Sequence, residues 1–201
     1  MTIDDARREF PVLQQQVFLD SACVSLVPQR VIQKLRTLLD FVAFCPSCSS
    51  TQLHIDMDAM RGTARPQIAK LINAAESDIA LVESTTHGLN LVANAIPLQR
   101  GDRILLSDLE FIEVAIPWIQ KREEIGIEID VLPNRNGQFT PEDIEAAITS
   151  NTRALALSSV QWNNGFRCDL DAISRLCRER QPRTFPIARS EPPVKKSPSS
   201  A

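Results

Sequence analysis

The chain has 201 residues, 43% of them hydrophobic and 23% charged, which is enough for a buried core and excludes wholesale disorder. No apolar run reaches the roughly 18 residues of a transmembrane helix, and the acidic start lacks a signal-peptide core. We therefore expect a soluble, cytoplasmic protein without a membrane partner. The net charge is −3, but residues 181–201 hold four basic groups and one acid. Residues 1–180 therefore carry an excess of acidic side chains, which argues against nucleic acid as a partner.

Two helices are predicted before residue 73. The first begins at Pro28, because proline suits a first helical turn. Its apolar residues recur at helical spacing on one stripe: Val31, Leu35, Leu38 and Val42. The stripe stops at Cys45-Pro46. A second apolar pattern over residues 57–72 predicts another helix, kinked at Pro66.

From residue 78 onward, short apolar runs alternate with helical patterns. The predicted strands are 79–83, 104–106, 127–132 and 154–158, and the predicted helices lie between and after them. Thr140-Pro141-Glu142-Asp143 is a strong helix start, with a capping hydroxyl, a proline and two acids that complement the helix dipole. Such alternation indicates an α/β fold with a parallel sheet covered on both faces.

The pattern ends after Arg180. Residues 181–201 hold five of the thirteen prolines and four serines, with almost no apolar periodicity, so we expect no packed element there. The expected organisation is an N-terminal arm over 1–27, a partial large domain over 28–180, and a disordered Pro/Ser/Arg-rich tail over 181–201.

The five cysteines are expected to be reduced thiols, since the chain carries no secretion signal. Cys45-Pro46-Ser47-Cys48 has the C-x-x-C form, which leaves zinc binding, redox chemistry and an exposed loop open. A structural zinc site needs a second pair, and Cys168 and Cys177 lie on one predicted helix, so we expect no metal.

Three polar or aromatic clusters follow predicted strands, at the edge where open parallel sheets bind ligands. The first is Ser84-Thr85-Thr86-His87-Gly88, where hydroxyls and backbone N–H groups at a helix start suit a phosphate, although Ser and Thr are also ordinary helix caps. The second is residues 107–111 with Pro117-Trp118, where an aromatic ring is able to stack on a planar ligand. The third is the amide-rich stretch 158–165.

The chain resembles the class V aminotransferase-fold enzymes, the pyridoxal-phosphate group of cysteine desulfurases, selenocysteine lyases and isopenicillin-N-epimerase-like proteins. Four stretches carry the resemblance over about residues 10–180. They are Phe10-Pro11 with Phe18-Leu19-Asp20-Ser21-Ala22, Thr85-Thr86-His87-Gly88-Leu89-Asn90-Leu91-Val92-Ala93, Asp108-Leu109-Glu110-Phe111 with Pro117-Trp118, and Val160-Gln161-Trp162 with Gly165 and Asp169-Leu170. The resemblance implies the large domain of an aspartate aminotransferase-like fold with an incomplete parallel-type sheet, pyridoxal 5'-phosphate as cofactor, an amino-acid substrate and a homodimer.

The resemblance also implies cofactor-binding roles. Thr85 and Thr86 would hold the phosphate, Phe111 would stack on the pyridine ring where desulfurases place His, and Gln161 or its neighbours would approach the ring hydroxyl. Val114 departs from the usual Asn of the family, and Phe111 lacks the acid/base group that desulfurases use.

The catalytic residues of such an enzyme do not appear in their family place. A carboxylate for the pyridinium nitrogen and a Schiff-base lysine are required, yet the expected strand and S-x-H-K segment after residue 180 are missing, and Lys195-Lys196 sit in Pro/Ser-rich sequence. We therefore assign no catalytic residue and expect at most weak cofactor binding and no activity of this chain alone. Two alternatives are a non-enzymatic truncated or frame-shifted product and a phosphate-binding α/β interaction domain.

Overall fold

A computed structural model describes residues 2–20, 22, 24–180 and 185–189 of the chain. It divides into two compact units, residues 1–80 and 81–201. This division falls inside the segment 28–180, for which one partial domain is expected, because the helices before residue 80 form a unit of their own. None of the described helices is long and apolar enough to cross a membrane.

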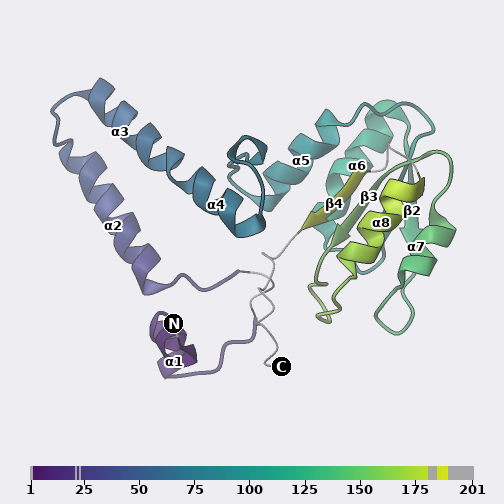
Figure 1. Ribbon diagram of the computed structural model, residues 1–201, viewed down its shortest axis with the longest axis horizontal. Helices are drawn as coiled ribbons and strands as arrows, with labels where there is room; N and C mark the ends of the chain where they lie inside the picture. The colour runs from purple at the N-terminus through teal and green to yellow at the C-terminus, as the bar shows by residue number, and fades with distance from the viewer. Residues whose placement is uncertain (1, 21, 23, 181–184, 190–201) are drawn as a thin grey trace. The chain divides into compact units, whose positions relative to one another are not determined.

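The first unit is helical (Figure 1). Its elements are α1 (Ile3–Arg8), the 3-10 turn η1 (Pro11–Gln14), α2 (Gln29–Phe44), α3 (Ser50–Gly62), α4 (Ala64–Ile72) and the 3-10 turn η2 (Glu76–Asp78). Pro28 is the N-cap of α2, and Cys45 ends that helix in the left-handed region, close to the predicted boundaries.

The helix predicted over residues 57–72 is two helices, not one kinked helix. α3 ends at Gly62 and α4 begins at Ala64. A proline ring clashes with the carbonyl four residues earlier, which for Pro66 is that of Gly62. The break therefore falls where the clash would lie, upstream of the proline.

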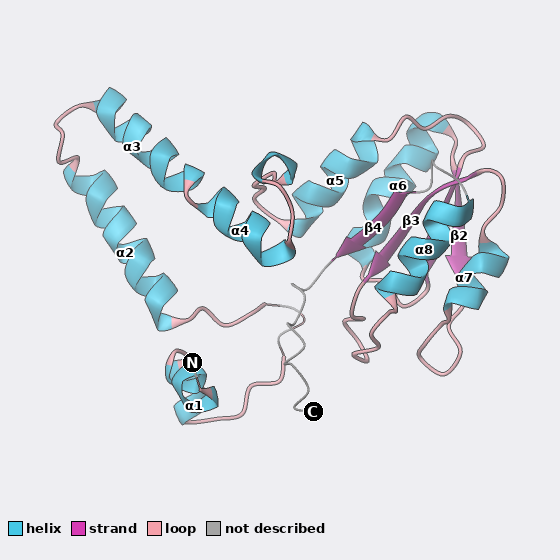
Figure 2. Ribbon diagram, viewed as in Figure 1, coloured by secondary structure: helices cyan, strands magenta, loops and turns pink. Residues whose placement is uncertain are grey.

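The second unit is a four-stranded parallel sheet in the order β2-β1-β3-β4, with helices around it (Figure 2). Its elements are α5 (Thr85–Ala95), β1 (Arg103–Ser107), α6 (Ile112–Ile125), β2 (Glu128–Leu132), α7 (Pro141–Ala147), β3 (Thr152–Ser158), α8 (Leu170–Arg180) and β4 (Phe185–Arg189). The register pairs Leu105 with Asp130 on one side and with Leu155 on the other. The predicted α/β class with a parallel sheet is confirmed.

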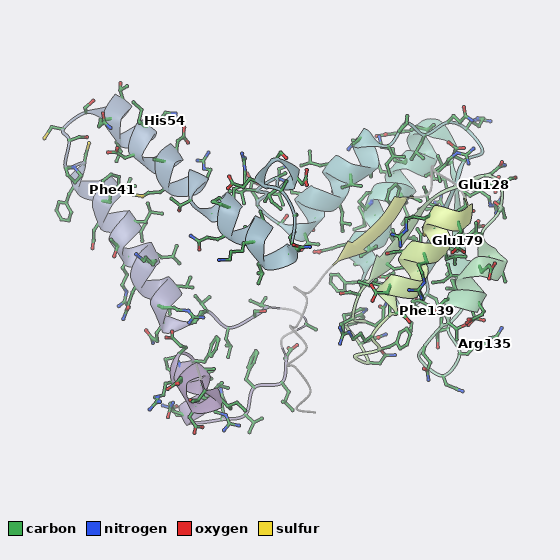
Figure 3. All side chains as sticks on the ribbon, viewed as in Figure 1. Phe41, His54, Glu128, Arg135, Phe139 and Glu179 are labelled. Atoms are coloured by element: carbon green, nitrogen blue, oxygen red, sulfur yellow. The ribbon has the colours of Figure 1, made fainter. Side chains whose placement is uncertain are left out.

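Alternate residues of the central strands enter two separate cores, because successive strand side chains point to opposite faces. On one face, Leu105, Leu155 and Leu157 pack with residues of α7 and α8. Phe139, labelled in Figure 3, belongs to this core, and its ring centroid is 5.1 Å from that of Phe166. On the other face, Ile104, Leu106, Ala154 and Ala156 pack with α5 and α6. Both faces of the sheet are therefore covered.

Two strand expectations are wrong. Residues 79–83 form no strand, and the side chains of Leu81 and Val82 are 38% and 42% exposed. Conversely, Phe185–Arg189, in a tail expected to lack packed elements, is β4 and pairs in parallel with β3. Proline has no N–H group to donate to a neighbouring strand. Pro186 is tolerated because β4 is an edge strand, and its outer side has no neighbouring strand that needs such a hydrogen bond. The remaining tail residues lie outside the described part of the chain.

Candidate functional site

The candidate site is the edge of the sheet where β1 and β3 end. These strands are neighbours and parallel, so the loops after Ser107 and Ser158 leave the sheet on the same side. Open parallel sheets bind ligands at this edge, between such loops. The predicted site residues Phe111 and Gln161 belong to these two loops.

One carboxylate joins the two loops. Glu110 accepts hydrogen bonds from the Ser158 N–H at 2.8 Å, from the Ser158 hydroxyl at 2.6 Å and from Gln161 Nε2 at 2.8 Å. Charged hydrogen bonds of this kind are about twice as strong as neutral ones. Glu110 therefore fixes Gln161 relative to the end of β1.

Gln161 carries an unused acceptor. Its side chain is 1% exposed, and its Oε1 has no hydrogen-bond partner among the described residues. An ionised carboxylate only accepts, so Glu110 fixes the amide with its NH₂ group toward the carboxylate. The remaining oxygen suits a ligand group that donates a hydrogen bond, since a buried acceptor without a partner is costly.

Phe111 forms an aromatic pair with Trp162. The ring centroids are 5.4 Å apart, and the ring planes make an angle of 71°. Phe111 is half-buried and is the N-cap residue of α6, while Trp162 is 50% exposed. The pair thus places two rings, one from each loop, at the same edge as Glu110 and Gln161.

Trp118, from the second polar and aromatic cluster of the sequence, is not part of this edge. Its side chain is fully buried in the core under α5 and α6, and its indole N–H has no partner among the described residues. Val114, which departs from the family's Asn, is also a core residue, at 2% exposure. Only Phe111 of this cluster is therefore available to a planar ligand.

Thr85 and Thr86 are the first two residues of α5. Ser84 is the cap, and its hydroxyl accepts a hydrogen bond from the His87 N–H at 3.1 Å. The hydroxyls and backbone N–H groups of Thr85 and Thr86 make no hydrogen bond to a described residue. Capping therefore leaves two hydroxyls and two N–H groups at a helix N-terminus, a donor set suited to an anion such as phosphate.

No hydrogen bond or ring contact in the described structure joins Thr85 or Thr86 to the Phe111–Gln161 edge. Both parts nevertheless belong to one packed unit. Leu89 and Ala93 of α5 pack against Ile104 and Leu106 of β1 and against α6. The structure thus brings Phe111 and Gln161 together and holds the threonines on a helix packed against the same strand.

Burial changes the pKa of Cys168, whose thiol lies next to the end of β3. Burial, and to a smaller degree the Glu110 carboxylate, raises the pKa of Cys168 to about 11, and the Cys168 thiol donates to the Ser158 carbonyl at 3.2 Å. Reactive cysteines have low pKa values and are partly exposed. Cys168 is therefore a structural residue.

Sequence reasoning missed Glu110 as a site residue. Its position three residues after a buried strand and directly before Phe111 is a signal that it lies at the sheet edge, but its partners are 48 and 51 residues away in the chain. The described lysines are Lys34 on α2, Lys70 on α4 and Lys121 on α6, so none is in either loop. Lys195 and Lys196 lie outside the described residues, and no group of three or more His, Cys, Asp or Glu able to hold a metal occurs among those described.

The chain is similar in sequence to cysteine desulfurases. It is 34% identical to a cysteine desulfurase of Yersinia pseudotuberculosis over 176 residues, which are 79% of this chain and 42% of the relative. It is 24% identical to a probable cysteine desulfurase of Methanothermobacter thermautotrophicus, over 89% of this chain and 45% of the relative. The chain therefore spans less than half the length of these relatives.

Solved structures share its fold. The cysteine desulfurase CsdA of Escherichia coli matches with a TM-score of 0.78 and 25% identity, over 94% of this chain and 48% of that one. A mutant of C-DES with glycine covalently linked to its pyridoxal-phosphate cofactor matches with a TM-score of 0.83 and 19% identity, over 92% of this chain and 49% of the other. The family model "Aminotransferase class-V" matches residues 17–184. The chain belongs to the class-V aminotransferase family.

Proposed function

We propose that this chain is the cofactor-cradling part of a pyridoxal-phosphate enzyme that acts on an amino acid, of the desulfurase, lyase or epimerase type. The observation that carries this proposal is the set of unused polar groups: the donors at the start of α5 and the buried acceptor of Gln161. Family membership supports the same cofactor.

The residues fit the cofactor part by part. Thr85 and Thr86 would hold its phosphate through their hydroxyls and N–H groups, and Phe111 would cover one face of its ring. Gln161, held by Glu110, would meet the ring hydroxyl. When bound, pyridoxal phosphate supplies an electron sink for carbanion formation next to an amino group.

We assign the residues described at this edge to binding and orienting the cofactor, and we assign no proton transfer to them. By the family resemblance, Phe111 would stand where desulfurases place His, and the two loops carry no lysine. We therefore infer that the chain by itself binds the cofactor reversibly and does not turn over an amino acid. A homodimer and a cytoplasmic location remain part of this proposal, supported by the family resemblance.

The test is cofactor titration of the purified chain, followed by fluorescence or absorbance. We expect pyridoxal phosphate to bind more tightly than pyridoxal, because only the former has the phosphate that α5 would hold. Thr86→Ala should weaken binding by about 10- to 150-fold, which corresponds to about 1.5–3 kcal/mol for a charge-assisted hydrogen bond. Thr37→Ala is the matched control, because Thr37 lies on α2 and its hydroxyl donates to the Gln33 carbonyl of the same helix, its one side-chain bond among the described residues.

Three outcomes decide between the candidate functions. Equal affinity of the Thr86→Ala variant and the parent would remove the phosphate assignment. Equal binding of inorganic phosphate and pyridoxal phosphate would favour the phosphate-binding interaction domain, which the free donors of α5 also suit. A covalent adduct on one lysine after borohydride reduction would contradict the inference that this chain lacks a catalytic lysine.

A further inference from the structure

The turn between α2 and α3 carries a pair of cysteines that the proposed function does not use. Cys45 ends α2, and Cys48 directly precedes Ser49, the N-cap of α3. Phe41 on α2 and His54 on α3 flank this turn (Figure 3). The C-x-x-C sequence left redox chemistry, metal binding and an ordinary loop open.

The backbone brings the two cysteines together. The Cys48 N–H donates to the Cys45 carbonyl at 2.8 Å, which closes a turn over Pro46 and Ser47. The end residues of such a four-residue turn have Cα atoms less than about 7 Å apart. A disulfide needs Cα atoms about 4.4–6.8 Å apart, so the turn presents the pair within the range of a bond.

Both cysteines have a backbone conformation that is unusual for their residue type. Among the described residues, four non-glycine residues have positive φ: Asn73, Asn136, Cys45 at 41° and Cys48 at 49°. Asparagine tolerates this region because its side chain bonds the local backbone. The Cys45 thiol, a weaker donor, bonds the Ser49 carbonyl at 3.7 Å, and no such bond is described for Cys48. Strained residues of this kind cluster at functional sites.

Ligand number and exposure select between the possible chemistries. No third His, Cys, Asp or Glu joins the pair among the described residues, so a closed metal site lacks ligands. Cys48 is exposed and Cys45 is half-buried, whereas Cys168 and Cys177 are buried. The pair is therefore open to a dissolved thiol reagent.

We propose that Cys45 and Cys48 are a redox modification site that forms a reversible intramolecular disulfide by exchange with a low-molecular-weight disulfide such as glutathione disulfide. The exposed Cys48 thiolate attacks one glutathione sulfur, which breaks the glutathione disulfide and releases one glutathione thiolate. The Cys45 thiolate then attacks the Cys48 sulfur and releases the second glutathione. The protein gives up two electrons and two thiol protons, which the two glutathione molecules receive.

The experiment measures the equilibrium constant of this exchange in the full chain, in glutathione buffers with and without urea. Samples are quenched in acid, alkylated and digested with trypsin. Cleavage at Arg36 and Arg61 gives a peptide, residues 37–61, with both cysteines and no other; Cys168 and Cys177 fall in separate peptides and serve as internal controls. We expect peptide 37–61 from the oxidised chain to have lost two hydrogens and to carry no alkyl group. The exchange constant should be about tenfold larger in the folded chain than in urea, because the turn raises the effective concentration of one cysteine at the other.

One serine substitution and one control substitution separate the two steps of the exchange. Cys45→Ser should stop at a mixed disulfide of Cys48 with glutathione, and Ser47→Ala, which keeps both thiols, should behave like the parent. Helix content from circular dichroism shows whether each variant keeps its fold. An exchange constant no larger in the folded chain than in urea, or a crosslink from peptide 37–61 to any other cysteine, would overturn the proposal.

Discussion

At the scale of single residues, Glu110 decides the geometry of the candidate site. Its carboxylate accepts three hydrogen bonds from residues at the end of β3, and one of them orients Gln161. The same bonds tie the loop after β1 to the loop after β3. Binding geometry and local stability are therefore expected to depend on the same side chain.

The substitution Glu110→Gln tests this role. The variant keeps the shape of the side chain but has one acceptor oxygen and no charge, so we expect the free energy of unfolding to fall by about 1.5–3 kcal/mol in urea titrations at low protein concentration. Glu123→Gln is the control, because Glu123 is exposed and its one partner among the described residues is Arg122, at 3.4 Å. Equal losses in the two variants would show that the Glu110 network contributes nothing specific.

Cys168 gives a pH-dependent prediction. Its pKa is raised from 9.0 to about 11 in the folded chain, so the folded state holds the thiol proton more tightly than the unfolded state. This stabilisation is present below pH 9 and is lost as the pH rises toward 11. We expect the melting temperature to fall over that range, and the fall to be smaller in Cys168→Ala. Parallel melting curves of parent and variant across this range would contradict the assignment.

At the scale of elements, helix starts are encoded locally. Thr140 caps α7: its hydroxyl accepts from the Asp143 N–H at 3.2 Å, and the Asp143 carboxylate accepts from the Thr140 N–H at 2.9 Å. Arg135, labelled in Figure 3, adds an ion pair to Asp143 at 3.2 Å. All of these partners lie within eight residues of one another, so the sequence pattern alone predicts this capping box.

The capping box makes the free energy of unfolding depend on pH in the acidic range. Hydrogen bonds from the backbone and hydroxyl of Thr140, with the charge of Arg135, hold the pKa of Asp143 below its usual value. The contribution is therefore present above the ordinary pKa of aspartate and is lost as the pH falls through the lowered value. Asp143→Asn should remove this part of the acid dependence of the melting temperature, whereas Glu142→Gln, outside the box, should retain it. A parent and an Asp143→Asn variant with the same acid dependence would exclude this role.

At the scale of the whole molecule, α2 presents apolar side chains to solvent. None of its residues is buried, and its stripe residues are between 36% and 51% exposed: Val31, Leu35, Leu38 and Val42. A contiguous exposed apolar surface promotes association. We expect the purified chain to self-associate as its concentration rises.

Paired charge substitutions on α2 test this expectation. Leu35→Glu places a charge on the stripe, whereas Gln33→Glu adds the same charge at an exposed position on the opposite side of the helix. Leu35→Glu should shift the population toward monomer in sedimentation or light-scattering measurements, and Gln33→Glu should not. A chain that stays monomeric, with a sharp melting transition independent of concentration, would refute the expectation.

The sequence by itself determined the parts of the protein that depend on neighbouring residues. The apolar runs of β1 and β3, the amphipathic pattern of α8 and the cap at Thr140 all follow from local spacing, and together they indicate the α/β class. The motif around Thr85 and Thr86 and the loops with Phe111 and Gln161 likewise indicate the family through the order and spacing of their residues along the chain.

The tertiary structure decided what depends on a distant partner. Residues 79–83 have a strand-like composition but no partner strand in the described sheet. Phe185–Arg189 lies in a Pro-rich stretch whose composition does not predict a strand, yet it pairs with the open edge of β3. Strand pairing, the role of Glu110 and the burial of Trp118 all arise from groups that folding brings together across the chain. Such contacts leave no local pattern, because a hydrogen bond between strands depends on which edges are open and not on either sequence alone.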